Sequence, residues 1–132
     1  MKILIVEDDF TNRLLLQGLL KGYGQYDIAV NGKEAVESVR LALDTGEPYD
    51  LICLDIMMPE MDGQQALREI RALEEARGIL STRGAKIVMV TALGDPKTVV
   101  GAFKGLCDAY LIKPIEKAKL FEELRKLGLI GQ

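Results

Sequence analysis

Polar side chains that could do chemistry follow four short apolar runs of this sequence. The runs cover residues 2–6, 51–54, 86–90 and 109–112. The polar residues that come directly after them are, in chain order, Glu7, Asp8 and Asp9, then Asp55, then Thr91, and last Lys113. Short apolar runs are typical of strands buried on both faces of a parallel sheet. The carboxyl ends of such strands line one edge of the sheet, so we expect these side chains to share one site.

Carboxylates gathered at one sheet edge need a counter-charge. Two of them repel by about 4 kcal/mol at 4 Å if the effective dielectric constant is near 20. A hard cation would offset this repulsion, and Mg2+ suits a site made of a few carboxylates and several waters. The chain has no histidine, and no cysteine lies in this cluster, so zinc is disfavoured. A competing interpretation makes single acids into caps for the segment that follows: Asp9 for a helix, or Asp55 for its loop.

The elements between these runs follow from hydrophobic periodicity and capping signals. We expect helices over about 11–21, over 31–46 with Asn31 and Glu34 approximating a capping box, after Asp62, from Asp95-Pro96, and over 116–127. A short second strand is expected at 26–30. Strands and helices then alternate five times, which predicts an α/β fold with parallel strands joined by right-handed crossovers.

Composition bounds the class of protein. The 132 residues suffice for one domain, and 48% hydrophobic residues suit a compact core. The net charge is −3 and there is no basic run, so a nucleic-acid surface is not expected. No apolar stretch reaches the length of a membrane span. The two cysteines, Cys53 and Cys107, lie in or beside apolar strands and predict buried thiols in a reducing cytoplasm.

The four strand-end positions, together with the segment D-I-M-M-P-E-M-D-G that begins at Asp55, resemble the receiver domain of bacterial two-component response regulators. The acid pair, the aspartate, the threonine and the Lys-Pro fall in that family's order and at its separations, and the resemblance covers 2–127. It implies a flavodoxin-like (CheY-like) doubly wound sheet of five parallel strands in the order 2-1-3-4-5, with helices on both faces. Because only a few residues follow Leu127, we expect a stand-alone receiver over 1–132 without an output domain.

The resemblance assigns a role to each acid. Asp55 would be the phosphoacceptor and, with Asp8, a direct ligand of Mg2+. Glu7 would act on the metal through water, and the backbone carbonyl of Met57 would supply another oxygen. Asp9 falls one position beyond the family's acid pair and is expected to be a cap only.

The resemblance also assigns the residues that respond to the phosphoryl group. Lys113 would pair with one phosphoryl oxygen, or neutralise the acids at rest, and both roles are compatible. Thr91 would donate its hydroxyl to another oxygen and move inward. Tyr110 would then swing into the space behind Thr91. The competing interpretations are a capping or strand-forming role for Thr91 and a half-buried strand tyrosine at 110.

The implied function is a phosphorylation-dependent switch in a two-component phosphorelay. The donor would be a histidine kinase or phosphotransfer protein, because this chain has no histidine. The signal would pass by protein binding to a downstream target on the surface formed by 96–127, and the chain would assist its own phosphorylation and dephosphorylation without turning over a substrate. One rival is a Mg-dependent phosphohydrolase with a D-x-D motif, but Met57 stands at the second acidic position. The other rival is an adaptor that keeps only the fold.

Overall fold

The computed structural model describes residues 1–58, 60–80, 83–92 and 106–131. Its strands are β1 (Lys2–Val6), β2 (Gln25–Ala29), β3 (Leu51–Asp55), β4 (Lys86–Thr91) and β5 (Ala109–Ile112). Its helices are α1 (Phe10–Leu20), the short 3-10 helix η1 (Lys21–Tyr23), α2 (Gly32–Asp44), α3 (Gly63–Ala76) and α5 (Lys117–Lys126). The helix predicted from Asp95-Pro96 lies outside the described residues. None of the described helices is both long and apolar enough to cross a membrane.

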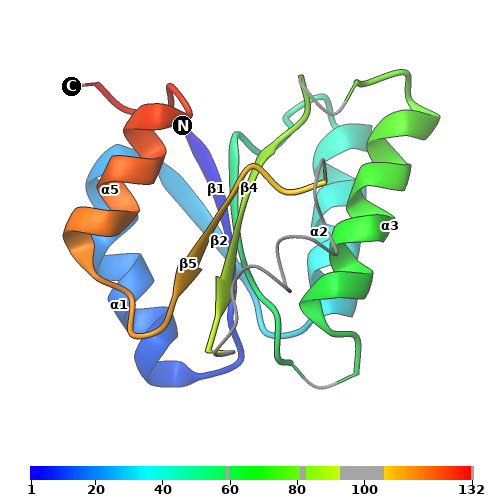
Figure 1. The fold of residues 1–132 in the computed structure, drawn as a ribbon. Helices are drawn as coiled ribbons and strands as arrows, with labels where there is room; N and C mark the ends of the chain where they lie inside the picture. Colours follow the sequence, from blue (N-terminus) through cyan, green and yellow to red (C-terminus); the bar gives the residue numbers. More distant parts are fainter. Residues whose placement is uncertain (59, 81–82, 93–105, 132) are drawn as a thin grey trace.

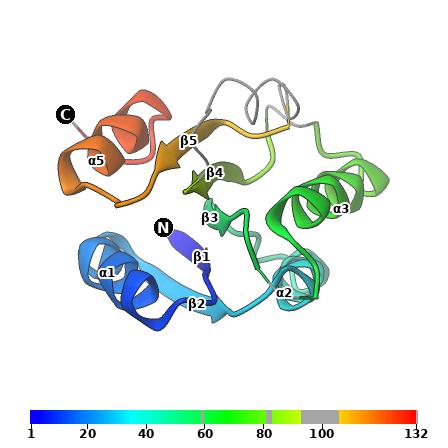
Figure 2. The ribbon, with the colours of Figure 1, turned by 60° about the horizontal axis from the view of Figure 1, so that its bottom comes forward.

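The five strands form one parallel sheet in the order β2-β1-β3-β4-β5 (Figure 1). This is the predicted order, and it makes β1 and β3 neighbours. Val6 pairs with Leu54, so the residues that follow β1 come out beside Asp55, the last residue of β3. Helices α1 and α5 cover one face of the sheet, and α2 and α3 cover the other (Figure 2).

Alternate residues of each central strand belong to two separate cores, because successive side chains of a strand point to opposite faces. In β1, Leu4 and Val6 pack with α2 and α3, whereas Ile3 and Ile5 pack with α1 and α5. All five residues of β3 are buried. The interior of the sheet is therefore covered on both faces, and its polar chemistry is confined to the strand ends.

The predicted caps begin three of the helices. Asp9 accepts the N–H of Asn12 at the start of α1, so its role as a cap is confirmed. Asn31 accepts the N–H of Glu34 while the Glu34 carboxylate accepts the N–H of Val30, which completes the predicted capping box. Asp62 caps α3 in the same way. The strand predicted at 26–30 begins and ends one residue earlier.

A buried charged network lies at the amino-terminal edge of the sheet, away from the acids. Arg71 of α3 donates to the carboxylates of Glu74 and Asp108 at 2.7 and 2.9 Å and to the backbone oxygens of Leu106 and Ala85 at 2.7 and 2.9 Å. Both acids also accept backbone N–H groups at the start of β4. The network thus ties α3 to the residues that enter β4 and β5.

Candidate functional site

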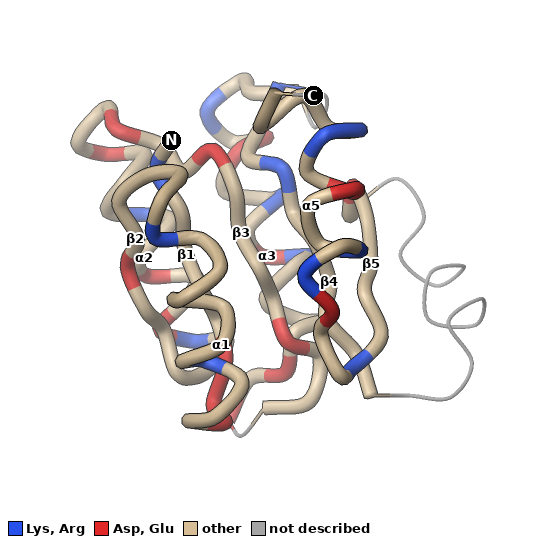
Figure 3. Tube along the Cα trace, turned by 90° about the vertical axis from the view of Figure 1, so that its left-hand side faces the viewer, with Lys and Arg blue, Asp and Glu red and all other residues tan. Residues whose placement is uncertain are grey.

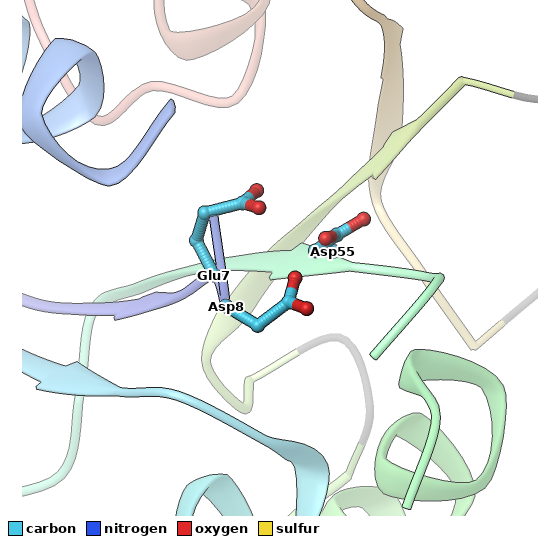
Figure 4. Close-up of side chains that lie close together, drawn as sticks. All are labelled: Glu7, Asp8 and Asp55. Atoms are coloured by element: carbon cyan, nitrogen blue, oxygen red, sulfur yellow. The ribbon is translucent and has the colours of Figure 1, made fainter. Parts of the chain in front are cut away.

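Three carboxylates meet at the carboxyl ends of β1 and β3. One oxygen from each of Glu7, Asp8 and Asp55 lies within 4.8 Å of the others, and Figure 4 shows the three groups side by side. Glu7 is 0% and Asp55 2% exposed, whereas Asp8 is exposed to solvent. Figure 3 shows the acidic positions gathered at the strand ends of this edge. The predicted acid cluster therefore exists, with one open side.

Glu7 is held by the backbone but is left with an unused oxygen. Its Oε1 accepts the N–H of Asp9 at 3.1 Å, and its own N–H donates to the carbonyl oxygen of Ala29 at 3.0 Å. Its Oε2 is buried without a hydrogen-bond partner. A buried carboxylate oxygen without a partner is costly, so this oxygen fits a site that also holds a hydrogen-bond donor.

Burial raises the pKa of Glu7 to about 7, and repulsion from Asp55 adds to this effect. Burial likewise raises the pKa of Asp55, although its interaction with the Glu7 carboxyl group and the charge of Lys113 act in the opposite direction. The two carboxyl groups therefore hold a proton more tightly than isolated carboxyl groups would. A cation at this position would compete with that proton.

Lys113 forms ion pairs with two of these acids. Its Nζ lies 3.3 Å from Asp55 Oδ2 and 3.4 Å from Glu7 Oε1. Burial opposes the charge of Lys113, but the attraction of the two carboxylates outweighs burial and raises its pKa. Its backbone N–H donates to the carbonyl oxygen of Thr91 at 2.7 Å, which joins the ends of β4 and β5. One ammonium group does not balance three carboxylates, so a divalent cation fits the remaining charge.

The donor set fits magnesium. Every candidate ligand is an oxygen, which suits a hard cation, and the exposed Asp8 leaves room for waters. The unused Glu7 Oε2 is free to accept a hydrogen bond from such a water. Met57, whose backbone carbonyl is the predicted metal ligand, donates its N–H to Asp55 Oδ1 at 3.3 Å. The backbone of this residue therefore contacts the aspartate.

The two predicted switch residues lie on neighbouring strands but in different environments. Thr91 is the last residue of β4 and is fully buried, and it follows Val90, which pairs with Asp55 across the sheet. Tyr110 lies on β5 and is 37% exposed. It lines a groove of about 470 Å³ between β5 and α5 and is not part of the acid cluster. The structure thus places Thr91 at the site and Tyr110 on the surface.

Two glycines, Gly63 and Gly32, make close backbone contacts with the loop after Asp55. Residue type alone does not reveal these contacts. Gly63 donates its N–H to the carbonyl oxygen of Ile56 at 2.9 Å, and a Cβ there would lie 2.2 Å from the carbonyl oxygen of Asp55. Gly32, at the start of α2, donates its N–H to the carbonyl oxygen of Met61 at 2.9 Å. The sequence signals are an Asn-Gly and an Asp-Gly pair, which indicate turns but not the partners of those turns.

Comparison with known proteins identifies the family of this chain. The family model described as "Response regulator receiver domain" matches residues 3–125. The chain is 38% identical to the transcriptional regulatory protein ZraR of Salmonella typhimurium over 94% of this chain and 25% of ZraR, so it spans about a quarter of that relative. It is 31% identical to the chemotaxis protein CheY of Listeria monocytogenes, over 96% of this chain and 97% of CheY.

A solved structure supports the same assignment. The receiver domain of the sensor histidine kinase PA1611 from Pseudomonas aeruginosa, with a magnesium ion coordinated in its active site cleft, matches with a TM-score of 0.75. The identity is 29%, and the match covers 96% of this chain and 97% of that one. The chain belongs to the response regulator receiver domain family, the phosphorylation-dependent signalling switches of two-component systems.

Proposed function

We propose that Asp55 is the phosphoacceptor of this receiver domain. The observation that carries the proposal is the position of its carboxylate, 3.3 Å from the Lys113 ammonium and beside Glu7 and Asp8 at the sheet edge. The carboxylate is almost fully buried, so it is poorly hydrated, and its orientation is set by Lys113 and by the N–H of Met57. A poorly hydrated, oriented carboxylate is suited to nucleophilic attack on phosphorus.

Mg2+ would be held at this edge by Asp8 and Asp55 directly, by Glu7 through water, and by the Met57 carbonyl. When bound, it offsets the negative charge of the carboxylates and of the phosphoryl oxygens. The PA1611 receiver, which coordinates magnesium in its cleft, supports this assignment. The orphaned oxygen of Glu7 supports it independently of any relative.

The transfer step uses a histidine of another protein, because this chain has none. A carboxylate oxygen of Asp55 attacks the phosphorus of a phosphohistidine, an O–P bond forms, and the P–N bond breaks. The electron pair of that bond stays on the imidazole nitrogen of the donor. Lys113 pairs with one of the phosphoryl oxygens, and its position stabilises the charge there as the bond changes. In this sense the chain assists the phosphorylation of Asp55 and the later hydrolysis of the phosphoaspartate, without turning over a free substrate.

The phosphoryl group would be detected by Thr91 and Tyr110. A phosphoaspartate adds charge and strong acceptor oxygens directly beside the end of β4. Movement of the Thr91 hydroxyl toward those oxygens would open space behind β4, and Tyr110 would turn inward from its exposed position to fill it. The groove between β5 and α5 would change shape with Tyr110 and would carry the signal to a downstream protein. The part of the predicted target surface at 96–105 lies outside the described residues.

The donor protein would approach over the open side of the acid cluster. Two large apolar side chains of α1, Phe10 and Leu14, are 63% and 48% exposed, and this helix begins two residues after Asp8. Apolar residues at a helical spacing of four lie on one face, which suits docking of a partner helix. This surface would hold the phosphohistidine over Asp55.

The test is phosphorylation by a small acyl phosphate such as acetyl phosphate, with and without Mg2+. Wild type should take up one phosphoryl group only with Mg2+, and peptide mapping should locate it on Asp55. Asp55→Asn should take up none. Asp62→Asn is the matched control, because asparagine keeps the cap of α3 in the same loop and should leave labelling unchanged. Labelling of Asp55→Asn, or sustained release of phosphate from simple phosphomonoesters, would contradict the proposal and favour a phosphohydrolase.

Magnesium affinity should depend on pH near neutrality. Burial and Asp55 raise the pKa of Glu7 to about 7, so a proton occupies the acid pair below that pH and must leave when the metal binds. Affinity should therefore fall about tenfold from pH 8 to pH 6. Titration calorimetry at several pH values would measure this, together with proton release in buffers of different ionisation enthalpy. A constant affinity across this range would contradict the shared proton.

A further inference from the structure

The loop between β3 and α3 is fixed to the rest of the molecule at both of its ends. At its start, the N–H of Ile56 donates to the carbonyl oxygen of Val90 at 3.0 Å. At its end, the N–H of Gly32 donates to the carbonyl oxygen of Met61 at 2.9 Å. Gly63 closes the loop on itself through its bond to Ile56. The described parts of this loop, residues 56–58 and 60–62, are therefore held by the sheet on one side and by the first turn of α2 on the other.

The contact at Gly32 admits no side chain. A Cβ at this position would lie 2.3 Å from the oxygen and 2.9 Å from the carbonyl carbon of Met61. These are backbone atoms, so the clash cannot be relieved by rotation of a flexible side chain. The helix cannot retreat easily either, because its capping box at Asn31 and its buried residues Ala35 and Val36 fix the first turn. The loop would have to move instead.

We infer that Gly32 is a positioning residue for the metal site, acting through Met61 on the loop that carries the Met57 carbonyl. This inference rests on the proposed function, which gives that carbonyl its role. The loop also contacts the acceptor itself, since the N–H of Met57 donates to Asp55 Oδ1. A displacement of the loop at Met61 thus reaches both a metal ligand and the orientation of the nucleophile. Gly32 itself touches neither.

The first test compares two glycine-to-alanine variants in helices. Gly32→Ala should weaken Mg2+ binding roughly tenfold, the scale on which indirect partners of a ligand act. Gly18→Ala in α1 is the control, because no atom lies within 4 Å of the Cβ it would add. It should leave Mg2+ affinity unchanged. Calorimetric titration with Mg2+ alone gives both values. If Gly32→Ala melts at a lower temperature but binds Mg2+ as tightly as wild type, the glycine is merely structural and the inference is wrong.

A second test uses wild type and does not require any variant to fold. Coupling between two sites is reciprocal, so if the Gly32 contact favours the metal site, the bound metal must favour the contact. Amide exchange at Gly32 should therefore slow severalfold on saturation with Mg2+. The reference is the amide of Thr45, which bonds to Leu41 at the opposite end of α2 and reports general stabilisation. Equal slowing of the two amides would overturn the inference.

The outcomes separate this inference from the proposed function. If wild type binds Mg2+ and is phosphorylated on Asp55, but Gly32→Ala behaves as wild type, only the role of Gly32 fails. If wild type binds no Mg2+, the proposed function and the inference fail together.

Discussion

Replacement of Arg71 by alanine is expected to destabilise the protein by about 3–5 kcal/mol, the usual result of breaking a buried ion pair on one side. Arg71 and Glu74 are 7% and 3% exposed, so the carboxylate left behind cannot be rehydrated without rearrangement. Asp108 would lose the same partner, and the backbone oxygens of Leu106 and Ala85 would each lose a donor. A loss of this size is a large part of the 5–15 kcal/mol that stabilises a typical domain. Urea denaturation monitored by circular dichroism would measure it.

The control for this prediction is Arg77, at the carboxyl end of the same helix. Arg77 pairs with Asp44, but the two side chains are 31% and 56% exposed. Arg77→Ala should therefore cost less than about 1 kcal/mol. The double variant Arg71→Ala/Glu74→Ala should lose less than the sum of its single variants, since the unpaired carboxylate of Glu74 is then absent and only that of Asp108 remains. Similar losses for Arg71→Ala and Arg77→Ala would show that the network contributes no more than a surface pair.

Asp8→Asn is expected to raise the stability of the metal-free protein and to abolish its stabilisation by Mg2+. The carboxylate of Asp8 adds a third negative charge within 4.8 Å of Glu7 and Asp55, and Lys113 forms ion pairs with the latter two. Removing that charge should gain about 1 kcal/mol, the value for one exposed charge pair at contact distance in water. Removal of a direct metal ligand should lower the affinity for Mg2+ by at least about 10–100-fold, which is the usual effect of removing a residue that only orients a ligand. Thermal melts with and without Mg2+ measure both effects.

Asp9→Asn provides the matched control for Asp8. The two aspartates are adjacent, but Asp9 caps α1, and asparagine caps helices about as well as aspartate. Asp9→Asn should therefore keep both the melting temperature and the gain from Mg2+. If Asp8→Asn melts below wild type without metal, or still gains stability from Mg2+, then repulsion among the site carboxylates does not limit the stability of the metal-free protein.

The site acids are recognisable from sequence because each directly follows an apolar run, and parallel strands bring such positions to one edge. The order of the strands is a different matter. Alternation of strands and helices predicts parallel pairing, but the placement of β1 between β2 and β3 came from the resemblance to a known family. Helix starts were predictable because Asp9, Asn31 and Asp62 act on amides only three residues away. Interactions that are local in sequence leave local signals.

The unpredicted contacts join segments that are far apart in the chain. Nothing in the sequence near Arg71 distinguishes it from Arg77, and its partners at Leu106 and Asp108 are set by the path of the chain into β5. In the same way, the pair Asn31-Gly32 announces a turn, but the carbonyl oxygen that requires glycine belongs to Met61. Such roles depend on tertiary approach, which residue type and spacing do not encode.

The position of the Arg71 network also determines how β5 can move. The network fixes the chain at Asp108, where it enters the strand, while Lys113 lies at the exit beside the acids. A segment that is held at one end and pushed at the other moves most at the end that is pushed. New charge on Asp55 therefore acts on β5 at its carboxyl end, where Lys113 contacts the acids, and we expect the strand to bend there rather than slide along β4. The displacement of β5 should therefore be concentrated at the end of the strand that lies beside the site.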